Sequence, residues 1–193
     1  MKMRRAHFSI GGIRVTLLSD CRSFVDEYLS LYAPYRRESA NDAIAVEIRA
    51  GHRFPWRRGP FLIRSEGIKE FQVRRRREVL PHLEWIINWQ IIQQRAEYVQ
   101  FHAATLEIGG NALILPGNPG CGKSTLTAGL LARGFSYLCD EFALIHRETL
   151  AAHPFPRALC MKESSFSVID GLGLPLRRKV PYRKPVKGRV AFL

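Results

Sequence analysis

The first part of the chain alternates apolar and polar residues, which is the pattern of strands that bury one face. Residues 7–10 and 13–18 flank Gly11-Gly12, a two-residue turn signal, and this arrangement predicts a β-hairpin. Later stretches with strand character are residues 43–49, 61–63 and 68–73. We therefore expect several short strands before the middle of the chain.

Two segments of the same region instead repeat apolar residues at helical spacing. The first is expected to end before Pro34, and its apolar face consists of Phe24, Tyr28, Leu31 and Tyr32. The second follows Pro81 and is expected to reach about Tyr98, with Trp85 and Trp89 packed in the core. With the strands, these helices predict a small α+β unit.

The second half of the chain mixes short apolar stretches with helical patterns, and this order predicts an α/β fold. The expected strands are residues 102–108, 111–115, 135–139, 142–146, 157–162 and 190–193, and the expected helices begin after Thr125 and at Ser164. We expect three parts: an α+β unit at residues 1–97, an α/β core at residues 98–170 and a basic tail at residues 171–193.

Residues 117–125 read GNPGCGKST and match the phosphate-binding pattern G-x-x-x-x-G-K-[ST]. Glycines let backbone N–H groups turn toward phosphate oxygens, and the following helix points its positive end at them. Lys123 adds charge for the β- and γ-phosphates, Ser124 offers a hydroxyl to Mg²⁺, and Thr125 can bond a further phosphate oxygen. The alternative is a glycine-proline turn that matches by chance. The residues expected to bind nucleotide are Gly117, Asn118, Pro119, Gly120, Cys121, Gly122, Lys123, Ser124 and Thr125.

Two neighbouring carboxylates follow the loop at the end of an expected strand. Asp140 and Glu141 stand 17 and 18 residues after Lys123. In a parallel sheet the carboxyl ends of strands gather beside the phosphate loop, where one acid could hold Mg²⁺ and the other could take the proton of an acceptor hydroxyl. Two solvated acids in a turn are the alternative. His102 heads the strand 102–108, and taken alone it is typical of a core or turn residue.

The formal net charge of +13, from 30 Lys and Arg against 17 Asp and Glu, indicates anionic partners. Nucleotide, acidic protein, nucleic acid and membrane surface all qualify, but no zinc pattern, RNA-binding aromatic signature or helix-turn-helix spacing favours nucleic acid. The four arginines at 74–77 are either a solvated strand end or an anion-binding patch. From Pro175 onward there are seven basic residues and no acidic one, and the apolar end leads us to expect a chain that continues beyond Leu193.

The four cysteines form no C-x-x-C pair, which argues against a metal knuckle. A disulfide framework does not suit a chain of 193 residues with a phosphate loop, so we expect a reducing, cytoplasmic setting. No run approaches 18 apolar residues and no signal peptide is evident, so we expect no membrane span.

The spacing of histidine, loop and acidic pair is specific in combination. Over residues 99–165 the chain resembles the HPr kinase/phosphorylase family, and more narrowly its short HPr-kinase-related members in bacterial exosortase and peptide-modification gene clusters. The resemblance is carried by Phe101-His102-Ala103, the stretch 112–115, GNPGCGKST, Leu126, Leu130 and Cys139-Asp140-Glu141. It implies a serine kinase of proteins or peptides, with a P-loop core of the HPr kinase and phosphoenolpyruvate carboxykinase type.

The resemblance also implies roles for single residues. Lys123 would hold phosphate, Ser124 would bind Mg²⁺, Asp140 would be the general base for the acceptor serine, and His102 would support Asp140. Glu141 stands where the family has a second aspartate; a glutamate can still bind metal, although it reaches further.

The chain departs from the family at the later E-I-R-G signature. The nearest match is Lys162-Glu163, so Glu163 is a candidate metal ligand. The family's phosphorylase activity depends on features near that signature, so the resemblance leaves this activity open. The expected cofactors are ATP and Mg²⁺, and the expected acceptor is an acidic or serine-bearing protein or peptide rather than HPr in particular. A homo-oligomer is left open. The alternatives are a P-loop NTPase with water as acceptor, a nucleotide-binding sensor or scaffold module and, more weakly, a basic NTPase associated with nucleic acid.

If the loop binds phosphate, ATP should protect the thiol of Cys121 from alkylation, because that residue lies inside the loop. Iodoacetamide labelling of the peptide containing Cys121, quantified by mass spectrometry with and without ATP and Mg²⁺, measures this protection. Equal labelling in the two conditions would count against phosphates on this loop.

Overall fold

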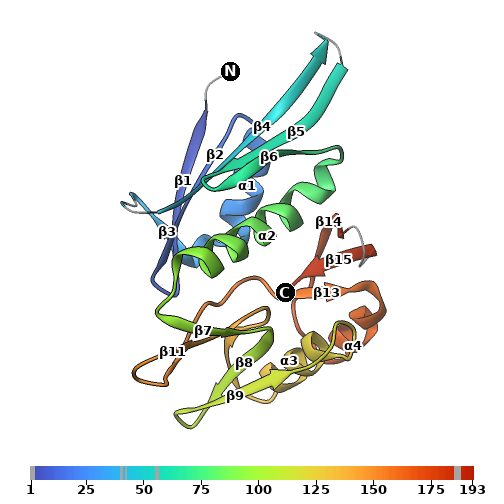
Figure 1. Ribbon diagram of the computed structural model, residues 1–193. Helices are drawn as coiled ribbons and strands as arrows, with labels where there is room; N and C mark the ends of the chain where they lie inside the picture. Colours follow the sequence, from blue (N-terminus) through green and yellow to red (C-terminus); the bar gives the residue numbers. More distant parts are fainter. Residues whose placement is uncertain (1–2, 40, 42, 55–56, 185–187) are drawn as a thin grey trace. The chain divides into compact units, whose positions relative to one another are not determined.

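The structure, a computed structural model, describes residues 3–39, 41, 43–54, 57–184 and 188–193. The chain divides into two compact units, Met1–Gln93 and Gln94–Leu193, and its fold is mixed α/β with four α-helices among the described residues (Figure 1). The domain boundaries expected after residues 97 and 170 stay predictions. In the described part of the chain, no helix has the length and apolar character needed to cross a membrane.

The first unit is built on a six-stranded sheet in the order β3-β1-β2-β4-β5-β6 (Figure 1). The strands are β1 (Arg4–Ile10), β2 (Ile13–Ser19), β3 (Arg36–Arg37), β4 (Ile44–Phe54), β5 (Arg57–Ser65) and β6 (Ile68–Val73). All neighbours are antiparallel except β2 and β4, which run parallel. The predicted hairpin is confirmed, because Ile10 pairs with Ile13 across the turn.

Helix α1 (Arg22–Leu31) packs its aromatic side chains against β1, and a short 3-10 helix η1 (Ala33–Tyr35) follows it. Phe8 and Tyr28 meet edge to face with ring centroids 4.9 Å apart, and Tyr32 lies 4.7 Å from Tyr28. All three side chains are almost completely buried. The helical face predicted from apolar spacing is therefore the face that makes the core.

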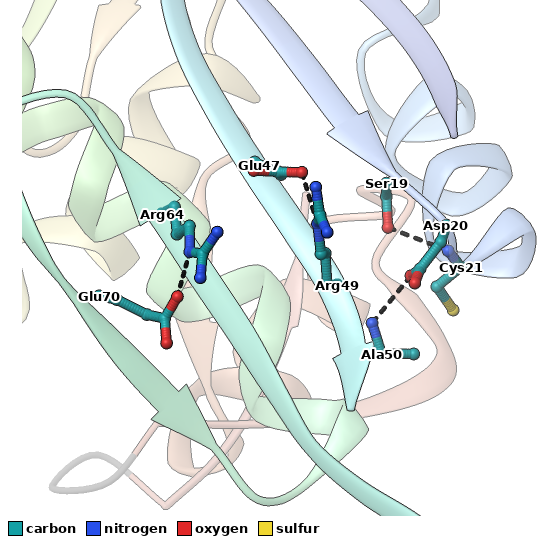
Figure 2. A network of polar contacts seen from close by, with 8 residues as sticks. All are labelled: Ser19, Asp20, Cys21, Glu47, Arg49, Ala50, Arg64 and Glu70. Atoms are coloured by element: carbon teal, nitrogen blue, oxygen red, sulfur yellow. Dashed lines mark hydrogen bonds and ion pairs between the residues drawn. The ribbon is translucent and has the colours of Figure 1, made fainter. Parts of the chain in front are cut away.

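Asp20 ties the start of α1 to the sheet. Its carboxylate accepts a hydrogen bond of 2.8 Å from the backbone N–H of Ala50 on β4, and Ser19 Oγ accepts one of 3.1 Å from the N–H of Cys21 (Figure 2). Figure 2 also shows two exposed ion pairs on the same sheet, Arg49 with Glu47 and Arg64 with Glu70. Exposed pairs of this kind contribute at most about 1 kcal/mol each, so the apolar core dominates.

Helix α2 (Arg76–Gln94) differs from its predicted bounds at both ends. Pro81 lies inside the helix instead of before it, because the buried Val79 and Leu80 hold the preceding turn in the core. Of the arginine run 74–77, Arg74 and Arg75 lie between the end of β6 and this helix, and Arg76 and Arg77 begin the helix. Arg76 pairs with Glu27 and lies 4.8 Å from the ring centroid of Phe24, so this arginine has a structural role.

The tryptophans of α2 are on its solvent face, and the expectation that they pack in the core was wrong. Trp85 is 53% exposed and Trp89 41%, and the two rings stack with centroids 6.1 Å apart. Helical periodicity explains this result, because a different face of α2 is buried. That buried face carries Leu83, Ile86, Ile87 and Ile91.

The described residues of the second unit form three small antiparallel sheets. Their orders are β10-β8-β9, β12-β11-β7 and β13-β15-β14. The strands are β7 (Tyr98–Phe101), β8 (Ala103–Ile108), β9 (Asn111–Pro116), β10 (Ser136–Cys139), β11 (Ala143–His146), β12 (Ala152–His153), β13 (Cys160–Lys162), β14 (Arg177–Lys184) and β15 (Gly188–Phe192). The parallel pairing assumed around the phosphate loop was wrong. β9 lies at the edge of its sheet among the described strands, so it is largely exposed rather than buried.

Helix α3 (Lys123–Leu131) shares a core with β13 and α4 (Phe166–Gly171), and the 3-10 helix η2 (Glu163–Ser165) connects the last two. The buried centre of this core is Ala128, Leu159, Met161 and Ile169. Residues after 171 also take part in the fold, since β14 and β15 pair with each other and Val190, Ala191 and Phe192 are buried.

Replacing Phe8 by alanine should destabilise the first unit by about 3–5 kcal/mol, because it leaves a cavity among the rings of α1. Urea denaturation followed by tyrosine and tryptophan fluorescence measures the change. Arg5→Ala on the same strand is the control, since Arg5 is exposed and its loss should cost less than about 0.5 kcal/mol. A Phe8→Ala protein as stable as Arg5→Ala would contradict the assigned core.

Candidate functional site

The segment 117–122 connects β9 to α3, so the predicted order of strand, loop and helix is confirmed. Gly120 and Gly122 have φ angles of 92° and 96°, a left-handed region that side chains rarely adopt, and Gly122 is the N-cap of α3. Gly117 is required for a different reason, because a Cβ there would stand 2.7 Å from Sγ of Cys121. The glycines that defined the motif are thus the positions where this backbone needs them.

The strand directions bring the phosphate loop, Asp140 and His102 to the same end of one sheet. β8 is antiparallel to both β9 and β10, so β9 and β10 run in the same direction. The carboxyl ends of β9 and β10 therefore lie at the same end of the sheet, where β9 leads into the loop and β10 into Asp140. The beginning of β8, which His102 precedes, lies at this end too. The sequence analysis expected these strand ends to lie together in a parallel sheet. Here they lie at the same end of the sheet although the antiparallel strand β8 separates β9 from β10.

Ser124 and Asp140 are in direct contact. The hydroxyl Oγ of Ser124, in the first turn of α3, lies 3.2 Å and 3.1 Å from the two carboxylate oxygens of Asp140. Both side chains are half-buried. A hydroxyl is a hard oxygen donor of the kind that Mg²⁺ takes when it also contacts phosphates, so Ser124 fits the expected cation. The contact places the Asp140 carboxylate directly beside that hydroxyl.

Lys123 lies over its own loop. Its Nζ donates hydrogen bonds of 2.5 Å to the carbonyl oxygen of Gly117 and 3.4 Å to that of Asn118. These contacts hold the ammonium at the start of the phosphate-binding pattern. The structure therefore keeps this charge within the loop segment to which the sequence assigned it.

His102 contacts the backbone of the acidic pair. Its Nδ1 is 3.1 Å from the carbonyl oxygen of Glu141. A carbonyl only accepts, so Nδ1 carries the proton in this bond, and in the neutral ring Nε2 keeps its lone pair. The imidazole also lies edge to face with Phe142, at 6.4 Å between ring centroids. His102 thus holds the turn that contains Asp140 and Glu141.

Glu163 is placed differently from the other predicted metal ligands. Its carboxylate forms an ion pair of 2.9 Å with Arg189 on β15, and the two side chains are 57% and 56% exposed. Over the described ranges, no three His, Cys, Asp or Glu side chains form a group that could hold a metal ion. Glu141 is half-buried, directly after Asp140.

Two residues beside the loop were missed by the sequence analysis. Oγ of Ser165 lies 2.8 Å from Oγ1 of Thr125, and Nζ of Lys162 lies 3.8 Å from the point where a Cβ on Gly120 would stand. The sequence did predict a strand at residues 157–162, and Lys162 is its last residue. Nothing in the sequence could show that this strand lies beside the loop, because the contact depends on long-range packing.

Cys139 precedes Asp140 and is buried. Burial raises the pKa of its thiol to about 11. The backbone N–H of Phe142 donates to Sγ at 3.4 Å and opposes this shift in part. The thiol is therefore protonated at neutral pH and serves as an apolar contact under the acidic turn.

Comparison with known proteins gives a partial relationship. A segment of 64 residues is 30% identical to the HPr kinase/phosphorylase of Pelodictyon phaeoclathratiforme (strain DSM 5477 / BU-1) and covers 33% of this chain. The match spans about a fifth of that relative, 19% of its length. No family model and no solved structure matches the chain. The similarity is thus to one segment of an HPr kinase/phosphorylase, and it does not test membership of the narrower exosortase-cluster group.

The buried thiol of Cys139 should make stability depend on pH in the alkaline range. Its folded pKa of about 11 lies above the ordinary value of about 8.5, so the unfolded chain loses this proton first. The stabilisation is complete below about pH 8.5 and is lost as the pH rises toward 11. Urea denaturation over this range should show a steeper loss for the wild type than for Cys139→Ala. The control Cys121→Ala, which removes an exposed thiol, should behave like the wild type, and equal slopes for all three proteins would contradict the assignment.

Proposed function

We propose that this protein is an ATP-dependent serine kinase, related to HPr kinase, that transfers the γ-phosphoryl group to a hydroxyl of a protein or peptide. The observation that carries the proposal is the contact of Ser124 with Asp140, which joins the phosphate-binding motif to the acidic pair. The partial similarity to an HPr kinase/phosphorylase supports the same reaction class. In this proposal the second unit is a P-loop kinase core.

The loop residues supply binding. Backbone N–H groups of the loop glycines and of the first turn of α3 would donate to phosphate oxygens, and the Lys123 ammonium would exchange its carbonyl contacts for phosphate. Mg²⁺, when bound, neutralises charge on the β- and γ-phosphates. Ser124 and Glu141 would hold it, while Glu163 would first have to leave Arg189.

Asp140 supplies the proton acceptor. Its carboxylate takes the proton of the acceptor hydroxyl while that oxygen bonds to the γ-phosphorus and the bond to the ADP oxygen breaks. His102 acts through the backbone as a positioning residue, because its Nδ1–H bond to the Glu141 carbonyl fixes the turn that presents Asp140. A net charge of +13 favours an acidic acceptor.

The direct test incubates the protein with γ-labelled ATP, Mg²⁺ and a library of acidic, serine-bearing peptides. Label on peptide serine is the expected result. Release of free phosphate alone would make the protein an NTPase, and ATP that binds without reacting would make it a nucleotide sensor. Either of these outcomes overturns the kinase assignment.

Asp140→Asn should lower phosphoryl transfer by about 10²–10⁴-fold, because the base is removed, while ATP binding is largely kept. Lys123→Ala should weaken ATP binding by about 10–150-fold, the cost of one charged hydrogen bond, and reduce transfer as well. Glu148→Gln, an exposed change in the same unit, is the control and should leave both unchanged. Calorimetry and the labelling assay separate the two effects, and near-normal transfer by Asp140→Asn would remove the assigned base.

A further inference from the structure

A second lysine side chain reaches the phosphate loop from outside the motif. The ammonium of Lys162 is the heavy atom that a Cβ on Gly120 would meet, at 3.8 Å. Gly120 is the second of the loop's three glycines and has no side chain of its own, so the space between its backbone and the Lys162 ammonium is not filled by that residue. Lys162 therefore stands at the position from which a cation can contact an anion bound to the loop.

The strand that carries Lys162 explains why it points there. Along β13, side chains alternate between two faces, and Leu159 and Met161 enter the core beneath α3. Lys162 must then face the opposite way. Its backbone is held by pairing with Val190 of β15, so the lysine projects from a sheet rather than from a free loop.

An independent contact fixes the same segment to the start of α3. Ser165, three residues after Lys162, lies with its hydroxyl 2.8 Å from that of Thr125 in the first turn of the helix. Glu163, the acid next to Lys162, is held by Arg189 at 2.9 Å. The segment 162–165 thus has one hydrogen bond to the helix start, an ammonium near Gly120 of the loop, and a carboxylate paired with β15.

We propose that Lys162 is a second phosphate-binding cation, which contacts the terminal phosphates of ATP together with Lys123. The inference rests on the proposed function and adds a residue that the sequence motif does not contain. The triphosphate of ATP carries several negative charges, and charge on the transferred group must be stabilised while it moves between two oxygens. A lysine from a separate strand approaches the phosphates from a side that the Lys123 ammonium, which lies against Gly117 and Asn118, does not occupy.

The test compares wild type, Lys162→Met, Lys162→Arg and the control Lys69→Met, which removes one exposed lysine from the first unit. Calorimetry gives the affinity for ATP and for ADP with Mg²⁺, and the labelling assay gives kcat and KM. Lys162→Met should weaken ATP binding by about tenfold, with a smaller effect on ADP, and should lower kcat. Lys162→Arg should recover part of both losses, and Lys69→Met should match the wild type.

The outcomes separate this inference from the proposed function. If the wild type binds and turns over ATP but Lys162→Met does so equally well, Lys162 is not a phosphate contact and the kinase assignment stands. If Lys162→Met and Lys69→Met lose affinity equally, the effect is one of overall charge and the inference is again wrong. If the wild type itself binds no ATP, the proposed function is overturned and the inference with it. Lys162→Arg keeps the test decisive should the methionine variant fail to fold.

Discussion

The candidate site depends on one hydrogen-bonded contact, that between the hydroxyl of Ser124 and the carboxylate of Asp140. It is made possible by β8, which separates β9 from β10 and is antiparallel to both. Neighbouring strands lie about 4.8 Å apart, so the ends of β9 and β10 are roughly 10 Å apart, and the loop with the first turn of α3 bridges that distance. Sheet geometry therefore sets the separation between the phosphate-binding loop and the acidic turn.

Local patterns were sufficient for much of the fold. The β1–β2 hairpin and the aromatic face of α1 followed from turn residues and apolar spacing, and the loop followed from its glycines, two of which have positive φ angles. The bounds of α2 did not follow from local patterns. A proline inside this helix is tolerated because the adjacent turn is buried, and burial is a tertiary property. Lys162 was missed for the same reason, since pairing of β13 with β15 joins residues far apart in sequence.

Stability and site geometry are linked through α3. One face of this helix supplies Ala128 to the core with Met161 and Ile169, and its first turn supplies Ser124 and Thr125 to the candidate site. Because protein interiors are close-packed, a change of volume at Met161 would shift β13 and α3 together. The loop is thus held from two sides: by β9, and by a core that includes the segment beside it.

Glu163 and Glu141, the two candidate carboxylate ligands of the metal, differ in their present contacts and in their positions. Glu163 is bound to Arg189 with both side chains more than half exposed, and such a pair contributes at most about 1 kcal/mol, so its loss alone is a small obstacle. The position of Glu163 is the larger obstacle, because this residue begins η2 directly after Lys162, the last residue of β13. A divalent cation and the Lys162 ammonium repel each other, which favours a cation on the Asp140 side of the loop. Glu141, in the turn fixed by His102, is already on that side.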